Sequence, residues 1–137
     1  MRLWPLLGVA LWTACAPALY RLEELPVSTR FGLVVPGGVL LARWQEGAVE
    51  ITRFRLVPEA PDRFEGLEAL GKRLRAQLEG RGFALRCETF NPLPFLGGPQ
   101  YTLRMARGAE GVGVFLKPLV EPDTYQVEVA PADPMPP

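Results

Sequence analysis

The sequence lacks histidine altogether, and serine and asparagine each occur once among its 137 residues. Histidine is the commonest general base and the commonest metal ligand in proteins, so its absence excludes a Ser-His-Asp triad and makes a zinc site implausible. The glycines fall in separate turns, which excludes a phosphate-binding loop and a dinucleotide fingerprint. We therefore expect no bound cofactor and no chemistry that depends on histidine.

Paired carboxylates are the catalytic groups that this composition leaves open. The candidates are Glu46, Glu50, Glu59, Asp62 and Glu88. None of them has a spacing that singles it out, and Asp62 is explained as a helix cap. We therefore predict that the chain is not an enzyme.

Charge of one sign is also missing, because 15 basic residues balance 15 acidic ones. No long-range field favours polyanions, which argues against a general nucleic-acid binder. Arginine greatly outnumbers lysine, a bias that is compatible with a heat-stable protein and also with a GC-rich genome. The length and the 48% hydrophobic content fit one domain.

The first residues have the order of a secretory signal. Arg2 supplies a positive charge, residues 3–14 form an uncharged apolar run, and small residues follow. The run is shorter than the ~20 residues that cross a bilayer, so a permanent transmembrane anchor is disfavoured. We predict that residues 1–18 direct export and that residues 19–30 are a tether.

Two routes of processing are open. The segment Trp12-Thr13-Ala14-Cys15 resembles the lipobox of bacterial lipoprotein signals, although Trp12 stands where that pattern has leucine. This resemblance implies a lipid on Cys15 and a membrane-anchored protein that faces the periplasm or the cell exterior. The other route is cleavage at Ala16-Pro17-Ala18, which predicts a soluble periplasmic or secreted protein that starts at Leu19.

Both routes remove Cys15 as a disulfide partner and leave Cys87 alone. Alternation along the strand-like segment puts Cys87 on the same face as Phe83 and Leu85, so we predict a buried core residue. A catalytic thiol is disfavoured because no histidine is present to act as its base.

We predict one globular domain over residues 31–130 and a disordered tail over residues 131–137. Residues 31–44 are rich in strand formers and are interrupted at Pro36-Gly37-Gly38, which indicates a tight hairpin or one strand with a bulge. In residues 48–57 the apolar positions change phase, which indicates either a bulge near Thr52 or a strand covered on both faces.

One amphipathic helix follows. Asp62 and Glu65 have the spacing of a capping box. The apolar stripe consists of Phe64, Leu67, Leu70, Leu74 and Leu78. Gly71 beside the stripe allows close approach of a sheet, and Gly80 and Gly82 end the helix.

Four strand-like segments complete the domain. They are residues 83–90, 100–106, 111–119 and 124–130. Short links between them predict a meander. We therefore predict an α+β fold in the order ββαββββ: an antiparallel sheet of about five to six strands with the helix packed on one face.

Two groups of residues are candidates for binding. Leu93, Phe95 and Leu96 lie in a proline-rich loop, where they either form a docking site for a protein or a lipid or fold back to cover the core. The second group consists of the strand arginines Arg43, Arg53, Arg55 and Arg104. These would suit an anionic partner, or they form a solvated face with Glu50 and Glu88 as cross-strand partners.

Location and the lack of catalytic groups together favour a non-catalytic binding or assembly module of the cell envelope, held by lipid on Cys15. It would contact another envelope protein through the sheet face or the apolar loop. The alternatives are a small-ligand carrier with an apolar cavity between helix and sheet, and a carboxylate-based enzyme.

Overall fold

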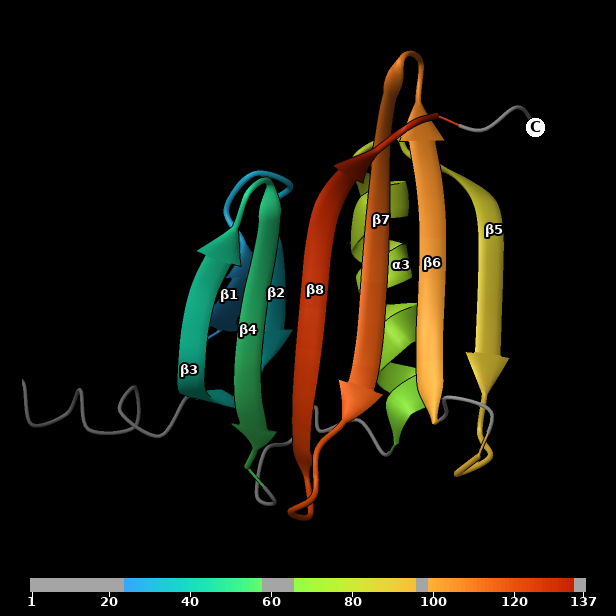
Figure 1. Cartoon of the computed structure of the whole chain (residues 1–137). Coiled ribbons are helices and arrows are strands. Elements are labelled where there is room, and N and C mark those ends of the chain that lie inside the picture. Colours follow the sequence, from blue (N-terminus) through green and yellow to red (C-terminus); the bar gives the residue numbers. More distant parts are fainter. Residues whose placement is uncertain (1–23, 58–65, 96–98, 135–137) are drawn as a thin grey trace, which may run out of the picture.

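The computed structural model describes residues 24–57, 66–95 and 99–134. Figure 1 shows a six-stranded antiparallel sheet with helix α3 on one side of it. A separate two-stranded hairpin lies beside the helix and contacts it. The predicted class, α+β with a helix on an antiparallel sheet, is confirmed.

The element order differs from the prediction, because four strands precede the helix instead of two. They are β1 (Glu24–Ser28), β2 (Leu33–Pro36), β3 (Gly38–Glu46) and β4 (Val49–Leu56). β1 falls within the predicted tether of residues 19–30, and its Val27 is buried in the core. The predicted tether of residues 19–30 therefore extends too far toward the C-terminus.

Pro36-Gly37-Gly38 forms neither a tight hairpin nor a bulge within one strand. β2 pairs only with β1, whereas β3 belongs to the large sheet, so the chain changes layers at this point. Gly37 has a φ of 78°, a conformation that is easy for glycine and strained for most other residues. The bulge of this region lies in β3, between Leu40 and Ala42.

β4 is regular, and Ile51 and Thr52 are both buried. Of the two predicted explanations for its phase change, coverage on both faces is the one observed. Ile51 lies opposite Trp44 of β3 on the face away from the helix, while Thr52 faces the hairpin and helix layer together with Phe54.

Helix α3 spans Leu67–Gly80 and buries one stripe of side chains. The stripe consists of Leu67, Leu70, Gly71, Leu74 and Leu78, in agreement with the predicted periodicity. A Cβ atom on Gly71 would overlap the ring of Tyr101, so the predicted close approach is also confirmed. Phe64 and the predicted capping residues Asp62 and Glu65 lie outside the described residues.

The remaining strands are β5 (Ala84–Asn91), β6 (Gln100–Arg107), β7 (Glu110–Pro118) and β8 (Thr124–Ala132). Each pairs antiparallel with the next, and β8 also pairs with β4, which gives the sheet order β3-β4-β8-β7-β6-β5. β8 continues to Ala132, so the first residues of the predicted disordered tail belong to a strand.

Candidate functional site

Exposed apolar side chains gather at one end of the sheet, the lower end in Figure 1. Leu93 is 45% exposed and Phe95 is 58% exposed on the segment that follows β5. Val120, in the turn between β7 and β8 at the same end, is fully exposed. Leu93 and Phe95 therefore do not cover the core, which was one of the two predicted alternatives. Leu96 lies outside the described residues.

The start of β3 adds to this group. Val39, Leu40 and Leu41 are between 38% and 51% exposed at the edge of the sheet. Val39 lies opposite Arg55 of β4, which in turn lies opposite Thr124 of β8, and this register places them at the same end as the β7–β8 turn. We call the following group the apolar end: Val39, Leu40, Leu41, Phe90, Leu93, Phe95 and Val120.

Five members of the apolar end were not predicted from the sequence. Val39 to Leu41 were predicted only as part of a segment rich in strand formers, because the sequence alone did not reveal that β3 is an edge strand. An apolar residue in a turn was the available signal for Val120, which lies directly before Glu121 and Pro122. Phe90 is the last apolar residue of β5 and is 36% exposed.

The chain also enters the described structure at the apolar end. Glu24 pairs with Pro36, and the side chain of Leu25 lies against Gly38, the first residue of β3. The described residues that come first in the sequence are therefore beside the exposed Val39.

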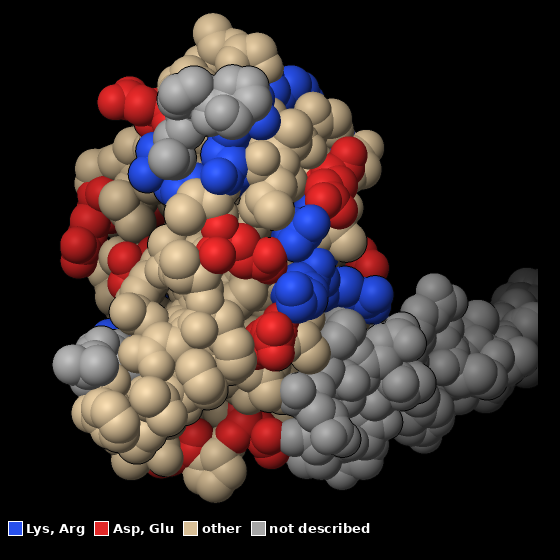
Figure 2. Space-filling model, turned by 90° about the vertical axis from the view of Figure 1, so that its right-hand side faces the viewer, with Lys and Arg blue, Asp and Glu red and all other residues tan. Residues whose placement is uncertain are grey.

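The opposite end is polar. Its turn between β6 and β7 holds an ion pair between Arg107 and Glu110 with a nitrogen–oxygen distance of 2.7 Å. Figure 2 looks at the β5 side of the molecule: charged groups of both signs cover the upper part, while the lower part is mainly uncharged with acidic groups at the bottom edge. The two ends therefore differ in chemistry.

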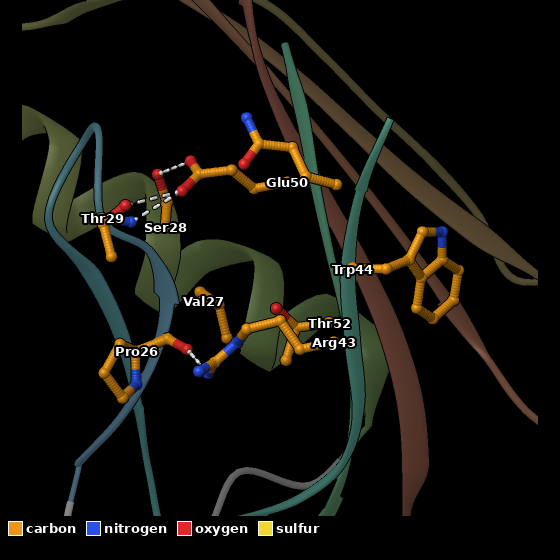
Figure 3. A pocket seen from close by; sticks show the side chains of 9 residues that line it. Pro26, Val27, Ser28, Thr29, Arg43, Trp44, Glu50 and Thr52 are labelled. Atoms are coloured by element: carbon orange, nitrogen blue, oxygen red, sulfur yellow. Dashed lines mark hydrogen bonds between the residues drawn. The ribbon is translucent and has the colours of Figure 1, made fainter. Parts of the chain in front are cut away.

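A pocket of about 300 Å³ lies where β1 crosses β3 and β4. It is lined by Pro26, Val27, Ser28, Thr29, Arg43, Trp44, Gln45, Glu50 and Thr52. Figure 3 shows the Arg43 guanidinium donating to the carbonyl oxygen of Pro26, and the Trp44 ring pointing away from the pocket. Arg43 therefore bonds to the hairpin.

Glu50 is the carboxylate of this pocket. It accepts hydrogen bonds from the Ser28 hydroxyl at 2.6 Å and from the backbone N–H and hydroxyl of Thr29, both at 2.9 Å (Figure 3). Burial acts to raise the pKa of Glu50, but these hydrogen bonds outweigh it and hold the pKa below the ordinary 4.5. The polar groups satisfy one another and fasten the tip of the hairpin to β4.

A second polar cluster centres on Glu88 of β5. Its carboxylate accepts a hydrogen bond from the Tyr101 hydroxyl and lies 2.7 Å from Arg75 and 3.6 Å from Lys72. The Tyr101 hydrogen bond lowers the pKa of Glu88 against the effect of burial, and both cations lower it further. Burial and the neighbouring carboxylate raise the pKa of Tyr101. The cluster joins α3 to β5 and β6.

The described carboxylates do not converge in one cleft. Glu50 lies on β4 and Glu88 on β5, and three strands separate these two in the sheet. Glu46 accepts a hydrogen bond from the Trp44 indole at 3.0 Å. Glu59 and Asp62 lie outside the described residues. Within the described ranges no three acidic or cysteine side chains are grouped to hold a metal ion.

The four arginines do not form one cluster. Arg53 and Arg55 share the face of the sheet that points away from the helix, whereas Arg43 projects from the opposite face into the pocket. Arg104 is on β6, which β8 and β7 separate from β4, and it donates to the carbonyl of Asp133.

Arg53 is held by neighbours on its own face. It stacks over the Trp44 ring at 5.3 Å and donates to Gln126 at 2.7 Å. Glu50 and Glu88 bond to groups on the hairpin and helix side, so they are not cross-strand partners of these arginines.

Cys87 is not in the core. A register shift between Leu85 and Cys87 turns Cys87 to the face away from the helix, opposite Arg104, where it is half-buried. The prediction from alternation was wrong here because a bulge changes the phase of the strand. Cys15 lies outside the described residues.

The space between α3 and the sheet is filled in the described part of the chain. Leu70, Leu74 and Leu78 of the helix and Leu103 and Leu116 of the sheet are fully buried in one core. The apolar cavity that a small-ligand carrier requires does not occur between these side chains.

No helix in the described part of the chain is long and apolar enough to cross a membrane. No family model matches the chain, and neither a curated protein nor a solved structure matches it.

Proposed function

We propose that this chain is a non-catalytic binding module of the cell envelope, exported by residues 1–18, held at the membrane by lipid on Cys15, and docked through its apolar end. The observation that carries the proposal is the exposure of Leu93, Phe95 and Val120 at the end where the chain enters the domain. Contact with an apolar surface would remove these side chains from water.

The asymmetry between the two ends supports docking in one orientation. Single exposed apolar residues scattered over a surface are normal and need no partner. Among the described residues the large exposed apolar side chains lie toward one end, and the opposite end presents the Arg107–Glu110 pair and other charged groups. A domain of this kind presents one end for binding and the other to water.

The carboxylates of the two polar clusters are hydrogen-bonded to other groups of the fold, which supports a non-catalytic role. Glu50 and Glu88 each accept hydrogen bonds from groups that tie two elements of the fold together. The pocket beside Glu50 therefore does not favour the carrier alternative, and the separation of the two carboxylates does not favour the enzyme alternative.

The lipid on Cys15 is the anchoring part of the proposal. One acyl chain alone gives marginal membrane binding, so the proposal implies the multiply acylated form that the lipobox resemblance predicts. The alternative is a soluble periplasmic or secreted binder that starts at Leu19, and in both cases another envelope component is the partner.

The test is the intact mass of the protein purified from its native host, measured separately for membrane and soluble fractions. The expected result is a membrane species that begins at Cys15 and carries the mass of the acyl groups. A soluble species beginning at Leu19 would contradict the lipid anchor and favour the soluble alternative. An intact Met1 in the cytoplasm would contradict export.

Matched cysteine variants sharpen this test. Cys15→Ser should move the protein to the soluble fraction or leave the signal unprocessed, whereas Cys87→Ser should change the mass only by the substitution itself and should keep the acyl groups and the membrane fraction. Identical behaviour of the two variants would overturn the assignment of Cys15 as the anchor.

A further inference from the structure

We infer that the apolar end docks on the lipid surface itself, with Leu93, Phe95 and Val120 entering the boundary between head groups and acyl chains. This inference rests on the proposed function, because the anchor brings this end to the membrane. It adds the chemistry of the partner, which is a lipid surface rather than a protein.

Only a short length of chain separates the proposed anchor, Cys15, from the apolar end. Glu24 is nine residues after Cys15, and an extended chain of that length spans at most about 30 Å. β7, with nine residues, is itself about 30 Å long. A lipid on Cys15 therefore keeps the apolar end within one domain length of the bilayer and allows the polar end to face away.

The exposed apolar side chains are distributed across the width of the sheet. Val39 to Leu41 lie on edge strand β3. Phe90 lies near the end of the other edge strand, β5, and Leu93 and Phe95 follow that strand. Val120 lies between the two edges, in the turn that joins β7 to β8. Six strands are about 24 Å wide. A row of that width along one end fits a flat interface better than it fits a groove. On a flat interface, all members of the row make contact together.

The residue types in this row also suit a lipid surface. Leucine and phenylalanine side chains are typical of apolar faces that enter a membrane interface to a depth of about 5–10 Å, and valine is apolar as well. Arg55 is exposed beside Val39, and the acidic Glu121 and Asp123 follow Val120 in its turn. Because both signs of charge border the row, we expect docking on neutral lipid as well as on anionic lipid.

The experiment measures the accessibility of single cysteines in the full-length lipidated protein with Cys87→Ala as background. Val120→Cys reports on the apolar end, and Ala109→Cys, in the exposed turn between β6 and β7, is the matched control. Both proteins are reconstituted into phosphatidylcholine vesicles, with and without phosphatidylglycerol, and are treated with a membrane-impermeant maleimide before and after detergent.

We expect Val120→Cys to be labelled roughly tenfold more slowly in vesicles than in detergent, and Ala109→Cys to be labelled at the same rate in both. Adding Phe95→Asp to Val120→Cys should restore fast labelling in vesicles, because the charged side chain opposes insertion. Equal rates for Val120→Cys in vesicles and detergent would overturn the inference.

The outcomes separate the inference from the proposed function. A lipidated mass combined with fast labelling of Val120→Cys leaves the anchored module standing and removes the lipid contact. Slow labelling in native membranes and fast labelling in pure lipid vesicles means that a protein covers the apolar end, which also overturns the inference. A mass without lipid on Cys15 contradicts the anchored module itself.

Discussion

The side-chain amide of Gln77 on α3 pairs with both backbone groups of Val34 on β2. The Val34 N–H donates to the Gln77 oxygen at 2.9 Å, and the Gln77 amide nitrogen donates to the Val34 carbonyl at 2.8 Å. One side chain thus supplies hydrogen bonds that a neighbouring strand would otherwise supply. This pair joins the helix to the hairpin, and the polar clusters around Glu50 and Glu88 join other elements of the fold in a similar way.

Gln77→Glu should destabilise the protein by about 1–3 kcal/mol, because the carboxylate keeps the acceptor for Val34 N–H but leaves the Val34 carbonyl without its donor. Urea unfolding at neutral pH measures the change. Gln45→Ala is the matched control, since Gln45 is exposed and makes one long hydrogen bond of 3.2 Å, to Gly47. A loss of stability no larger than that of the control would contradict the structural role of the pair.

Gly71→Ala should destabilise the protein by roughly 1–3 kcal/mol, because the added methyl group would overlap the Tyr101 ring. This loss opposes the gain in helix propensity of about 1 kcal/mol that alanine normally brings. Gly80→Ala is the control on the same helix, since nothing lies within 4 Å of the added atom. In thermal unfolding, we expect Gly71→Ala to lower the melting temperature and Gly80→Ala to raise it or leave it unchanged. An equal rise in melting temperature for both variants would contradict the close approach of Gly71 and Tyr101.

Stability should fall in acid partly through Glu50. Its pKa in the folded protein is lowered from 4.5, so the carboxylate contributes stability above that value and loses it as pH falls through the folded pKa. Glu50→Gln should therefore be less stable than the parent protein at about pH 7 and should lose less stability on going to about pH 3.

Urea titrations at both pH values test this expectation for Glu50. Glu121→Gln makes the same change of charge on an exposed turn and should keep the pH dependence of the parent protein. If the stability of the Glu50→Gln protein changes with pH as steeply as that of the parent protein, the contact between Glu50 and the hairpin is not the source of the pH dependence.

Cys87 should react with an aqueous thiol reagent without unfolding of the protein, because it is half-buried on the face away from the helix. The measurement is the labelling rate in a Cys15→Ser background at increasing concentrations of denaturant. We expect a rate that is independent of denaturant below the unfolding transition. Leu103→Cys is a fully buried comparison and should react only through opening of the structure.

Local patterns predicted the parts of the fold that depend on neighbours in the sequence. The three- and four-residue spacing of Leu67, Leu70, Leu74 and Leu78 determines a helix with one buried face wherever it packs. Alternation in the strands after the helix and the short links between them likewise predicted a meander, which is present. These elements could be predicted because their signals are contained within a few residues.

The tertiary structure decided which strands became edges, and thereby formed the apolar end. Val39 to Leu41 have the composition of a buried strand, and they are exposed because β3 has a neighbour on one side only. The bulge before Cys87 reversed a phase that alternation had predicted, since a single extra residue exchanges the two faces of a strand.

By itself, then, the sequence determined the α+β class, the amphipathic helix, the absence of histidine chemistry and the expectation of an export signal. Only the tertiary structure decided that Leu93, Phe95, Val120 and the start of β3 lie at one end beside the first described residues. The physical reason is that exposure depends on which strands pair, and this pairing joins residues far apart in the chain, such as Arg55 and Thr124.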